Sequence, residues 1–297
     1  MESKAVADYV HYKMIQTHVN MAMIFNSYSP SFVRPLHDSN WRYNCYPFLF
    51  TETFPNVGQE AIKEYSYIWR LGLEYLLITD SIFDMPKNVV PSDILWAQLY
   101  YDSFFRQLHS FFPSNSRFWY YYENYLQEYM QAILSETCKI RDLKATYSSE
   151  EFEHISAGRS AFGKLAIAGL AIMDGSEQKI PPLASSHDYF SVALQFRDDL
   201  QDWLEDFNNS NYTYLIRYAL FLKGISIDDF VNNRLTEEEL KEIIYQSGAA
   251  DWALEQSRAY LLRAYEAASS FNVPEWLGFF NQISESLDVF QHDIDDI

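Results

Sequence analysis

The sequence contains few residues that break, loosen or cross-link a chain. Nine glycines and ten prolines are scattered along 297 residues, without any linker-like or low-complexity tract. Only two cysteines occur, Cys45 and Cys138, and their spacing fits neither a disulfide framework nor a metal motif. This cysteine usage indicates a reducing compartment, so we expect a cytoplasmic protein. Hydrophobic residues make up 48% of the chain, which is enough for a large core, and we predict one domain over residues 1–297.

Positive charge is also scarce. The chain has 22 Lys and Arg residues against 41 Asp and Glu residues, which gives a formal net charge of −19. Such a balance disfavours nucleic acid or an anionic membrane as the main partner. No apolar run reaches membrane-spanning length, and the N-terminus lacks the basic and then apolar pattern of a secretory signal. We therefore expect a small-molecule partner and no integral membrane segment.

No segment shows the alternation of apolar and polar residues that is typical of a strand. Apolar residues instead recur at helical spacing along most of the chain, and the predicted fold is all-α. Capping boxes at Ser148 and Thr236 indicate where two of the helices begin. The helices are expected at 5–25, 58–85, 92–112, 117–140, 148–173, 186–207, 212–223, 236–245, 249–271 and 274–291.

The most informative stretch is an acidic run inside the helix expected at 186–207. It holds five carboxylates between Asp198 and Asp206, interleaved with large apolar residues. On a helix, Asp198, Asp202 and Asp206 form one row, with Asp199 and Gln195 beside it. Like charges at this spacing cost roughly 0.2–0.5 kcal/mol per pair, so a compensating ligand is expected. Mg²⁺ takes such oxygen ligands, often together with substrate phosphates. An acidic surface helix is the alternative, which the apolar neighbours disfavour.

A second pair of carboxylates, Asp80 and Asp84, shares a face at the end of the helix expected at 58–85. Between the two acidic segments lies a helix rich in small residues that carries Arg159 and Lys164. Cations in so apolar a setting require anionic partners. If the two acidic faces oppose each other, they can bracket a diphosphate through Mg²⁺, and the cations can take the remaining phosphate charge.

These segments resemble a known family. Leu194-Gln195-x-x-Asp198-Asp199-x-x-Asp202 is similar to the second aspartate-rich motif of the trans-isoprenyl diphosphate synthases, and Asp80-Ser81-x-x-Asp84 is similar to the first, with Ser81 in place of an Asp. Arg159-Ser160-Ala161 resembles the family's Lys-Thr-Gly segment, and Tyr212-Thr213-Tyr214-Leu215 its Thr-Tyr-Pro-Leu segment. The resemblance covers about residues 60–290.

The resemblance implies a terpenoid-synthase-type helical bundle around a central apolar cavity, and in the family also a homodimer. It assigns Mg²⁺ to Asp80, Asp84, Asp198 and Asp202, with Asp199 as a further catalytic carboxylate. It assigns diphosphate binding to Arg159, Lys164 and Gln195, and the walls of the substrate pocket to Tyr75 and Leu76.

The departures from the family affect the predicted reaction. Chain-elongating members hold isopentenyl diphosphate with an N-terminal Gly-Lys-x-x-Arg-Pro element and an Arg pair after the first motif. Here only Arg34-Pro35 matches the former, Arg42 follows it at a distance, and no Arg pair follows Asp84. We therefore expect a class I terpene cyclase, which ionises farnesyl or geranylgeranyl diphosphate with Mg²⁺, releases pyrophosphate and forms a terpene hydrocarbon or alcohol. The alternative is a trans-prenyltransferase that elongates an allylic diphosphate with isopentenyl diphosphate.

Two hypotheses from other functional classes remain. Glu151 and His154 have the spacing of a di-iron motif, but such a site needs two of these motifs and further Glu residues. A non-catalytic binding protein with the same fold is suggested by Ser81, although the other aspartates of both motifs are present.

Overall fold

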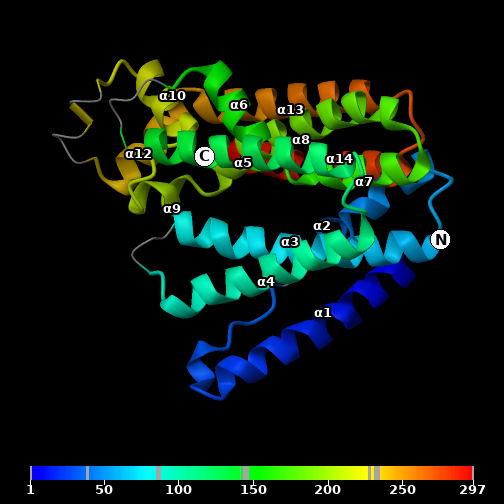
Figure 1. The fold of residues 1–297 in the computed structure, drawn as a ribbon. Helices are drawn as coiled ribbons and strands as arrows, with labels where there is room; N and C mark the ends of the chain where they lie inside the picture. The colour runs from blue at the N-terminus through cyan, green and yellow to red at the C-terminus, as the bar shows by residue number, and fades with distance from the viewer. Residues whose placement is uncertain are drawn as a thin grey trace. The chain divides into compact units, whose positions relative to one another are not determined.

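A computed structural model describes residues 2–37, 40–84, 88–140, 142, 147–226, 229–230 and 235–295; for residues 84, 140 and 293–295 it describes the backbone alone. These parts of the chain contain helices joined by loops and no strand, which confirms the all-α prediction (Figure 1). The helices are α1 (Ser3–Asn26), α2 (Trp41–Asn44), α3 (Gln59–Asp84), α4 (Pro91–Phe111), α5 (Phe118–Ile140), α6 (Ser149–Arg159), α7 (Gly163–Asp174), α8 (Ile180–Gln201), α9 (Trp203–Asn208), α10 (Tyr214–Leu222), α12 (Glu237–Gln246), α13 (Ala249–Ala268) and α14 (Pro274–Asp295), with short 3-10 helices η1 (Pro30–Phe32), η2 (Tyr46–Thr53) and η3 (Glu177–Lys179).

Two of the predicted helices differ from the structure, by an internal break or by more than a few residues at their ends. The helix expected at 148–173 is broken into α6 and α7 at residues 160–162. The helix expected at 186–207 begins earlier, at Ile180, because Pro181 and Pro182 occupy its first turn, where the missing amide donor is not needed. It also ends earlier, at Gln201, and continues after Asp202 as α9.

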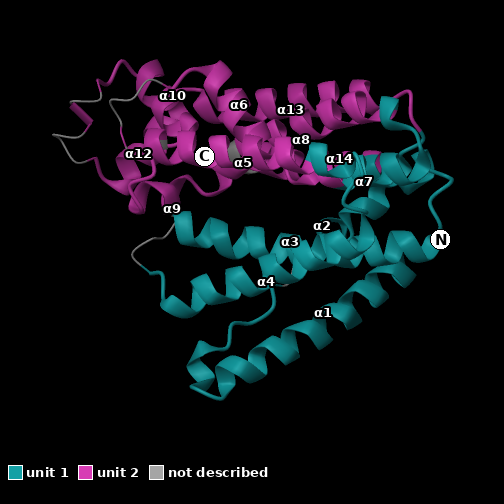
Figure 2. Ribbon diagram, viewed as in Figure 1, with its two compact units in different colours: residues 1–121, 166–178, 272–276 teal, residues 122–165, 179–271, 277–297 magenta. Residues whose placement is uncertain are grey.

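The chain divides into two compact units (Figure 2). Unit 1 contains residues 1–121, 166–178 and 272–276, and unit 2 contains residues 122–165, 179–271 and 277–297. The prediction of a single domain stays a prediction, and each unit is described by itself.

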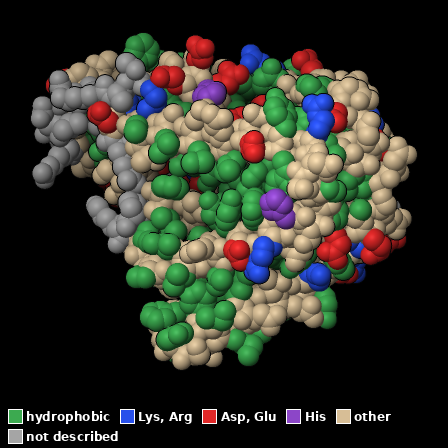
Figure 3. Space-filling model, viewed as in Figure 1, with side chains coloured by type: hydrophobic (Ala, Val, Ile, Leu, Met, Phe, Trp, Pro, Cys, Tyr) green, Lys and Arg blue, Asp and Glu red, His purple; other side chains and the backbone are tan. Residues whose placement is uncertain are grey.

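In unit 1, helix α3 packs against α1 and α4. Trp96 of α4 is fully buried, and its ring stacks on Phe25 at 4.4 Å and on His18 at 4.9 Å between centroids. Gly169 allows a close approach to α3, because a Cβ atom there would lie 2.2 Å from the hydroxyl oxygen of Tyr65. The outer face of α1 is apolar, with Tyr12, Val19 and Met23 among its exposed residues, and hydrophobic side chains gather over it (Figure 3).

In unit 2, helices α8 and α13 pack along their length, and two buried serines set their register. Ser186 Oγ donates to the carbonyl of Ala264 at 2.7 Å, and Ser257 Oγ donates to the carbonyl of Ala193 at 2.8 Å. The small side chains at these positions let the two backbones come close. This contact holds α8, the helix with the acidic run, in the core of the unit.

Among the described residues, no single helix has both the length and the hydropathy that crossing a membrane requires. Helices α6 and α7, taken together as a bent pair, do reach that length and hydropathy.

Candidate active site

The predicted row of aspartates is formed at the C-terminal end of α8 in unit 2. The helix ends formally at Gln201, yet backbone hydrogen bonds continue across the break. The amide of Asp202 donates to the carbonyl of Asp198 at 2.8 Å, and the amide of Asp206 donates to that of Asp202 at 2.9 Å. These bonds preserve the spacing of one helical turn between successive members, so the predicted row is present despite the change of helix.

Asp199 lies beside this row and is more buried than the three aspartates that form it, with 3% of its surface exposed. The Gln195 side chain donates to its Oδ1 at 2.7 Å, while its Oδ2 is buried and has no hydrogen-bond partner among the described residues. Gln195 therefore orients a carboxylate here. Its predicted contact with diphosphate stays a prediction.

The charges of these carboxylates are not fully compensated. Burial raises the pKa of Asp199 well above its ordinary value, and the charges of Asp206 and Glu136 raise it further, although the Gln195 hydrogen bond and the Leu215 backbone oppose the rise. Burial also raises the pKa of Asp198, although its ion pair with Arg197 at 2.8 Å opposes the rise, and the pKa of the exposed Asp202 is raised as well, by burial and then Glu205. A local excess of negative charge is the physical condition that a divalent cation relieves.

Arg159 ends α6 and approaches the acidic row from the side. Its Nη1 donates to Glu136 Oε1 of α5 at 2.8 Å, and 20% of its side chain is exposed. Its charge also lowers the pKa of Asp198, so the two groups are close enough to interact. Arg159 is thus not solvent-facing. Its predicted diphosphate contact stays a prediction that this location supports.

Two members of this cluster were not predicted from the sequence. Glu136 is 9% exposed, and it neutralises Arg159 while adding negative charge near Asp199. Tyr147 has a strongly raised pKa, because burial and the charges of Asp199 and Glu136 all disfavour its phenolate. Nothing in the sequence around either residue indicates the site, since their proximity depends on how α5 and α6 pack against α8.

Lys164, at the start of α7, lies elsewhere in unit 2. Its Nζ forms ion pairs with Glu128 at 2.5 Å and with Asp188 at 2.9 Å, and 4% of its side chain is exposed. Asp188 and Asp198 are ten residues apart on α8, which corresponds to about 15 Å of helix. The ion pairs therefore do not join Lys164 to the acidic row, and its assignment to diphosphate binding stays a prediction without support from them.

The elbow between α6 and α7 is held by a buried histidine of α8. Burial, aided by the charge of Lys164, lowers the pKa of His187 to about 3, so the ring is neutral and its Nε2 donates to the carbonyl of Ser160 at 2.7 Å. Gly163 is required beside the ring, because a Cβ atom there would lie 2.2 Å from His187 Cε1. This contact fixes the chain immediately after Arg159.

The first predicted motif lies in unit 1, at the end of α3. Asp80 is half-buried, and the Ser81 hydroxyl donates to the carbonyl of Leu77 at 2.9 Å within its own helix. The side chain of Asp84 lies outside the described residues. Tyr75 and Leu76 are half-buried one turn earlier, where the Tyr75 ring packs on Tyr101 at 5.0 Å. The pocket role of Tyr75 and Leu76 stays a prediction, as does the opposition of the two motifs, which belong to different units.

The donor set of unit 2 fits Mg²⁺ that arrives with a phosphate ligand. Among the described side chains, no group of three or more His, Cys, Asp or Glu residues is arranged to hold a metal ion by itself. Mg²⁺ is, however, often bound through one or two carboxylates plus substrate phosphates. Asp198 and Asp202 supply such a pair of oxygen donors, and the unpartnered Oδ2 of Asp199 adds a buried acceptor.

Comparison with known proteins identifies the fold. No protein-family model and no curated protein matches the chain by sequence. Among solved structures, the chain is similar to the heptaprenyl diphosphate synthase from Staphylococcus aureus (TM-score 0.71, 13% identity, covering 97% of this chain and 98% of that one). It is also similar to the geranylgeranyl pyrophosphate synthetase from Geoglobus acetivorans (TM-score 0.68, 16% identity, covering 97% of each chain). A third similar structure is that of the geranylgeranyl pyrophosphate synthase from Corynebacterium glutamicum, solved with isoprenyl diphosphate and magnesium (TM-score 0.70, 14% identity, covering 97% of this chain and 96% of that one).

The chain therefore has the fold of the trans-isoprenyl diphosphate synthases, as the aspartate motifs predicted. The same finding contradicts the prediction of a terpene cyclase. Solved structures that resemble the chain include synthases of polyprenyl, geranylgeranyl and heptaprenyl diphosphates, which favours the prenyltransferase alternative over a cyclase. A missing Arg pair after Asp84 is weak evidence against elongation, because cations that are distant in sequence can lie close together in the fold.

Proposed function

We propose that this protein is a trans-prenyltransferase, which joins an allylic isoprenyl diphosphate to isopentenyl diphosphate and releases pyrophosphate. The observation that carries the proposal is the cluster of Asp198, Asp199 and Asp202 at the end of α8, in a chain that follows the prenyl synthase fold over almost its whole length. In that fold, the structure from Corynebacterium glutamicum contains isoprenyl diphosphate and magnesium. We assign the same ligand class to this cluster.

Asp198 and Asp202 would hold Mg²⁺, which when bound supplies Lewis-acid stabilisation of a departing diphosphate. Arg159 lies beside them and carries a planar guanidinium with five N–H donors, a geometry that matches phosphate oxygens in pairs. Glu136 fixes the orientation of that guanidinium through its 2.8 Å ion pair. The His187 contact with Ser160 holds the backbone after Arg159, so the cation stays in place when the substrate leaves.

A second diphosphate needs cations of its own, and one is available near the first motif. Arg34 forms an ion pair with Asp93 at 2.8 Å and lines a cavity of about 180 Å³ together with Ser81 and Asn88, which flank the end of α3. Arg34-Pro35 is also the fragment that resembles the isopentenyl diphosphate element of elongating enzymes. Its location supports elongation more than its isolated position in the sequence suggested.

The proposal is tested with purified protein, Mg²⁺ and farnesyl diphosphate, with and without isopentenyl diphosphate, by mass spectrometry of the products. We expect consumption of farnesyl diphosphate only when both substrates are present, and a diphosphate longer by one isoprene unit or more. Asp198→Asn should reduce the rate by about a hundredfold or more, since metal stabilisation of the leaving group is worth several kcal/mol.

Asp102→Asn is the matched control, because Asp102 of α4 is an exposed carboxylate paired only with Arg106 at 2.7 Å among the described residues. It should leave the rate unchanged. A terpene hydrocarbon or alcohol from farnesyl diphosphate alone would contradict the proposal. So would the absence of turnover with dimethylallyl, geranyl, farnesyl and geranylgeranyl diphosphates, which would favour a binding protein.

A further inference from the structure

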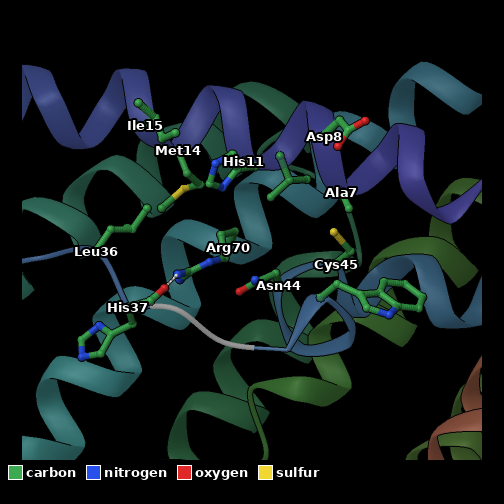
Figure 4. A pocket seen from close by; sticks show the side chains of 12 residues that line it. Ala7, Asp8, His11, Met14, Ile15, Leu36, His37, Asn44, Cys45 and Arg70 are labelled. Atoms are coloured by element: carbon green, nitrogen blue, oxygen red, sulfur yellow. Dashed lines mark hydrogen bonds between the residues drawn. The ribbon is translucent and has the colours of Figure 1, made fainter.

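Unit 1 contains a cavity that none of the predicted site residues lines. It lies between α1, residues 36–37 and 41–45, and α3, and its volume is about 540 Å³ (Figure 4). Small-molecule pockets have volumes of about 300–1,000 Å³, whereas one water molecule occupies about 30 Å³. The cavity is therefore of a size for a small organic ligand.

The walls of the cavity are of two kinds. Met14 of α1, Leu36 and Trp41 form an apolar part. His11 of α1, Asn44 and Arg70 of α3 form a polar part, and Figure 4 shows Arg70 between α1 and the segment that carries His37. A pocket with an apolar wall and a few convergent polar groups is the usual form of a site for an amphiphilic small molecule.

Arg70 is the unusual member of the lining. Only 3% of its surface is exposed. Its Nη2 donates to the carbonyl of His37 at 2.8 Å and to Glu74 Oε1 at 2.5 Å. Its Nη1 is buried and has no hydrogen-bond partner among the described residues. A buried donor on a charged group is costly to leave unpaired, so an acceptor at Nη1 would be bound with an appreciable gain.

The charges around the cavity limit which acceptor fits. Glu74 already compensates the charge of Arg70, and Asp8 adds a carboxylate to the cavity wall. A phosphate or diphosphate carries two or more negative charges, and the positive charge around the cavity is too small to balance them. A monoanion gains the hydrogen bonds of Nη1 with less repulsion. Away from solvent, such a charge-assisted bond is stronger than in water.

We infer that this cavity binds a small monocarboxylate with an apolar body, whose carboxylate accepts from Arg70 Nη1 and whose hydrocarbon part lies against Met14 and Leu36. The inference is independent of prenyl transfer. It uses neither aspartate motif nor Arg159.

Isothermal titration calorimetry with octanoate tests the inference, with octan-1-ol and inorganic phosphate as comparison probes. Octanoate should bind to the wild-type protein about tenfold or more tightly than octan-1-ol, because the alcohol lacks the charged acceptor. Phosphate should not bind measurably. Equal affinities for octanoate and octan-1-ol, or phosphate binding in place of octanoate, would overturn the inference.

Two variants locate the binding. Arg70→Lys keeps a cation beside Glu74 but lacks the second nitrogen of the fork, and should weaken octanoate about tenfold or more. Ala7→Phe fills the cavity from α1, leaves Arg70 and Glu74 untouched, and should abolish binding. Arg106→Lys, on the exposed face of α4, is the control and should bind normally.

Octanoate binding that survives Ala7→Phe lies elsewhere in the protein and overturns the inference. If Arg70→Lys fails to fold by circular dichroism, Ala7→Phe decides alone, since it leaves the ion pair intact. Absence of octanoate binding to the folded wild-type protein also overturns it.

Discussion

A buried carboxylate is compensated by nearby cations in unit 1, whereas a buried carboxylate in unit 2 is not. In unit 1, Glu74 is 1% exposed and accepts from Arg70 at 2.5 Å and from the His37 ring at 2.7 Å. In unit 2, Asp199 is almost as buried, yet the charges of Asp206 and Glu136 are of the same sign as its own and raise its pKa. We call Arg70 and Glu74 the closed pair, because their charges compensate each other. We call Asp198, Asp199 and Asp202 the open cluster, because a bound cation can compensate their negative charge.

The pKa directions express the same contrast. Burial would raise the pKa of Glu74, but the hydrogen bonds and charges of His37 and Arg70 outweigh it and lower the pKa below its ordinary value. Burial raises the pKa of Asp199; the Gln195 hydrogen bond and the Leu215 backbone oppose this rise without cancelling it, and the charges of Asp206 and Glu136 add to it. A compensated buried charge serves the fold of the protein. An uncompensated one lowers its stability and is retained where a ligand supplies the missing charge.

The largest expected effect comes from breaking the closed pair. Glu74→Ala leaves Arg70 buried without its carboxylate, and should lower the free energy of unfolding by about 3–5 kcal/mol. Chemical denaturation measures this loss. Asp102→Ala is the matched control, because Asp102 and Arg106 form the same i,i+4 pair on an exposed helix face. Exposed pairs contribute about 0–1 kcal/mol. Equal losses in the two variants would remove the distinction between a buried and an exposed pair.

The second largest effect is expected at Arg159, the cation beside the open cluster. Arg159→Lys keeps a charge for Glu136 but loses the planar fork that matches phosphate oxygens, and kcat/KM for prenyl transfer should fall about ten- to a hundredfold. The melting temperature should change little. Arg258→Lys, which alters the more exposed ion pair between Arg258 of α13 and Asp288 of α14, should keep full activity. A fully active Arg159→Lys enzyme would separate Arg159 from the diphosphate.

A smaller effect of opposite sign is expected within the open cluster. Asp199→Asn removes the buried negative charge, while its amide oxygen still accepts from Gln195. In the metal-free protein this variant should be more stable by about 1 kcal/mol, a rise of a few degrees in melting temperature, and it should have lower activity. Glu255→Gln, at an exposed position in the middle of α13, should change neither property. Destabilisation by Asp199→Asn would show that the carboxylate is compensated after all.

The pH dependence of stability should differ in sign between the two carboxylates. The folded-state pKa of Glu74 lies below 4.5, so its contribution is present above pH 4.5 and is lost as pH falls through the lowered pKa. The folded-state pKa of Asp199 lies above 3.8, so the folded protein loses stability as pH rises from 3.8 through the raised pKa. The free energy of unfolding is measured from acidic to neutral pH in the presence of EDTA. The loss of stability at low pH should be absent from Glu74→Gln, and the loss of stability with rising pH should be absent from Asp199→Asn.

Most of the fold could be predicted from local signals. The helix expected at 58–85 is α3 (Gln59–Asp84), and the one expected at 117–140 is α5 (Phe118–Ile140), because apolar periodicity and helix-ending residues act over short distances. The break between α6 and α7 was missed, since it depends on His187, which is close to Ser160 only in the folded chain. The predicted start of α8 was wrong because prolines in a first turn resemble a loop.

The candidate site was predictable only in part, for the same reason. Asp198, Asp199 and Asp202 are neighbours in the sequence, so one helix brings them together. Glu136 and Tyr147 join them only through packing between helices, which leaves no mark on the local sequence. Lys164 was grouped with Arg159 because both are cations in an apolar segment. Its partners, Glu128 and Asp188, could not be identified without the structure.

The central claim, that the open carboxylate cluster of unit 2 holds Mg²⁺ together with a diphosphate, is tested most directly by melting temperature. The protein is melted with Mg²⁺ alone, with pyrophosphate alone and with both, and Asp198→Asn is melted under the same conditions. We predict that the two ligands together raise the melting temperature by several degrees, well beyond the sum of their separate effects, because ligand at a hundred times its Kd stabilises by about 2.7 kcal/mol. Asp198→Asn should lose this synergy while remaining folded. Purely additive shifts in the wild-type protein, or undiminished synergy in Asp198→Asn, would contradict the claim.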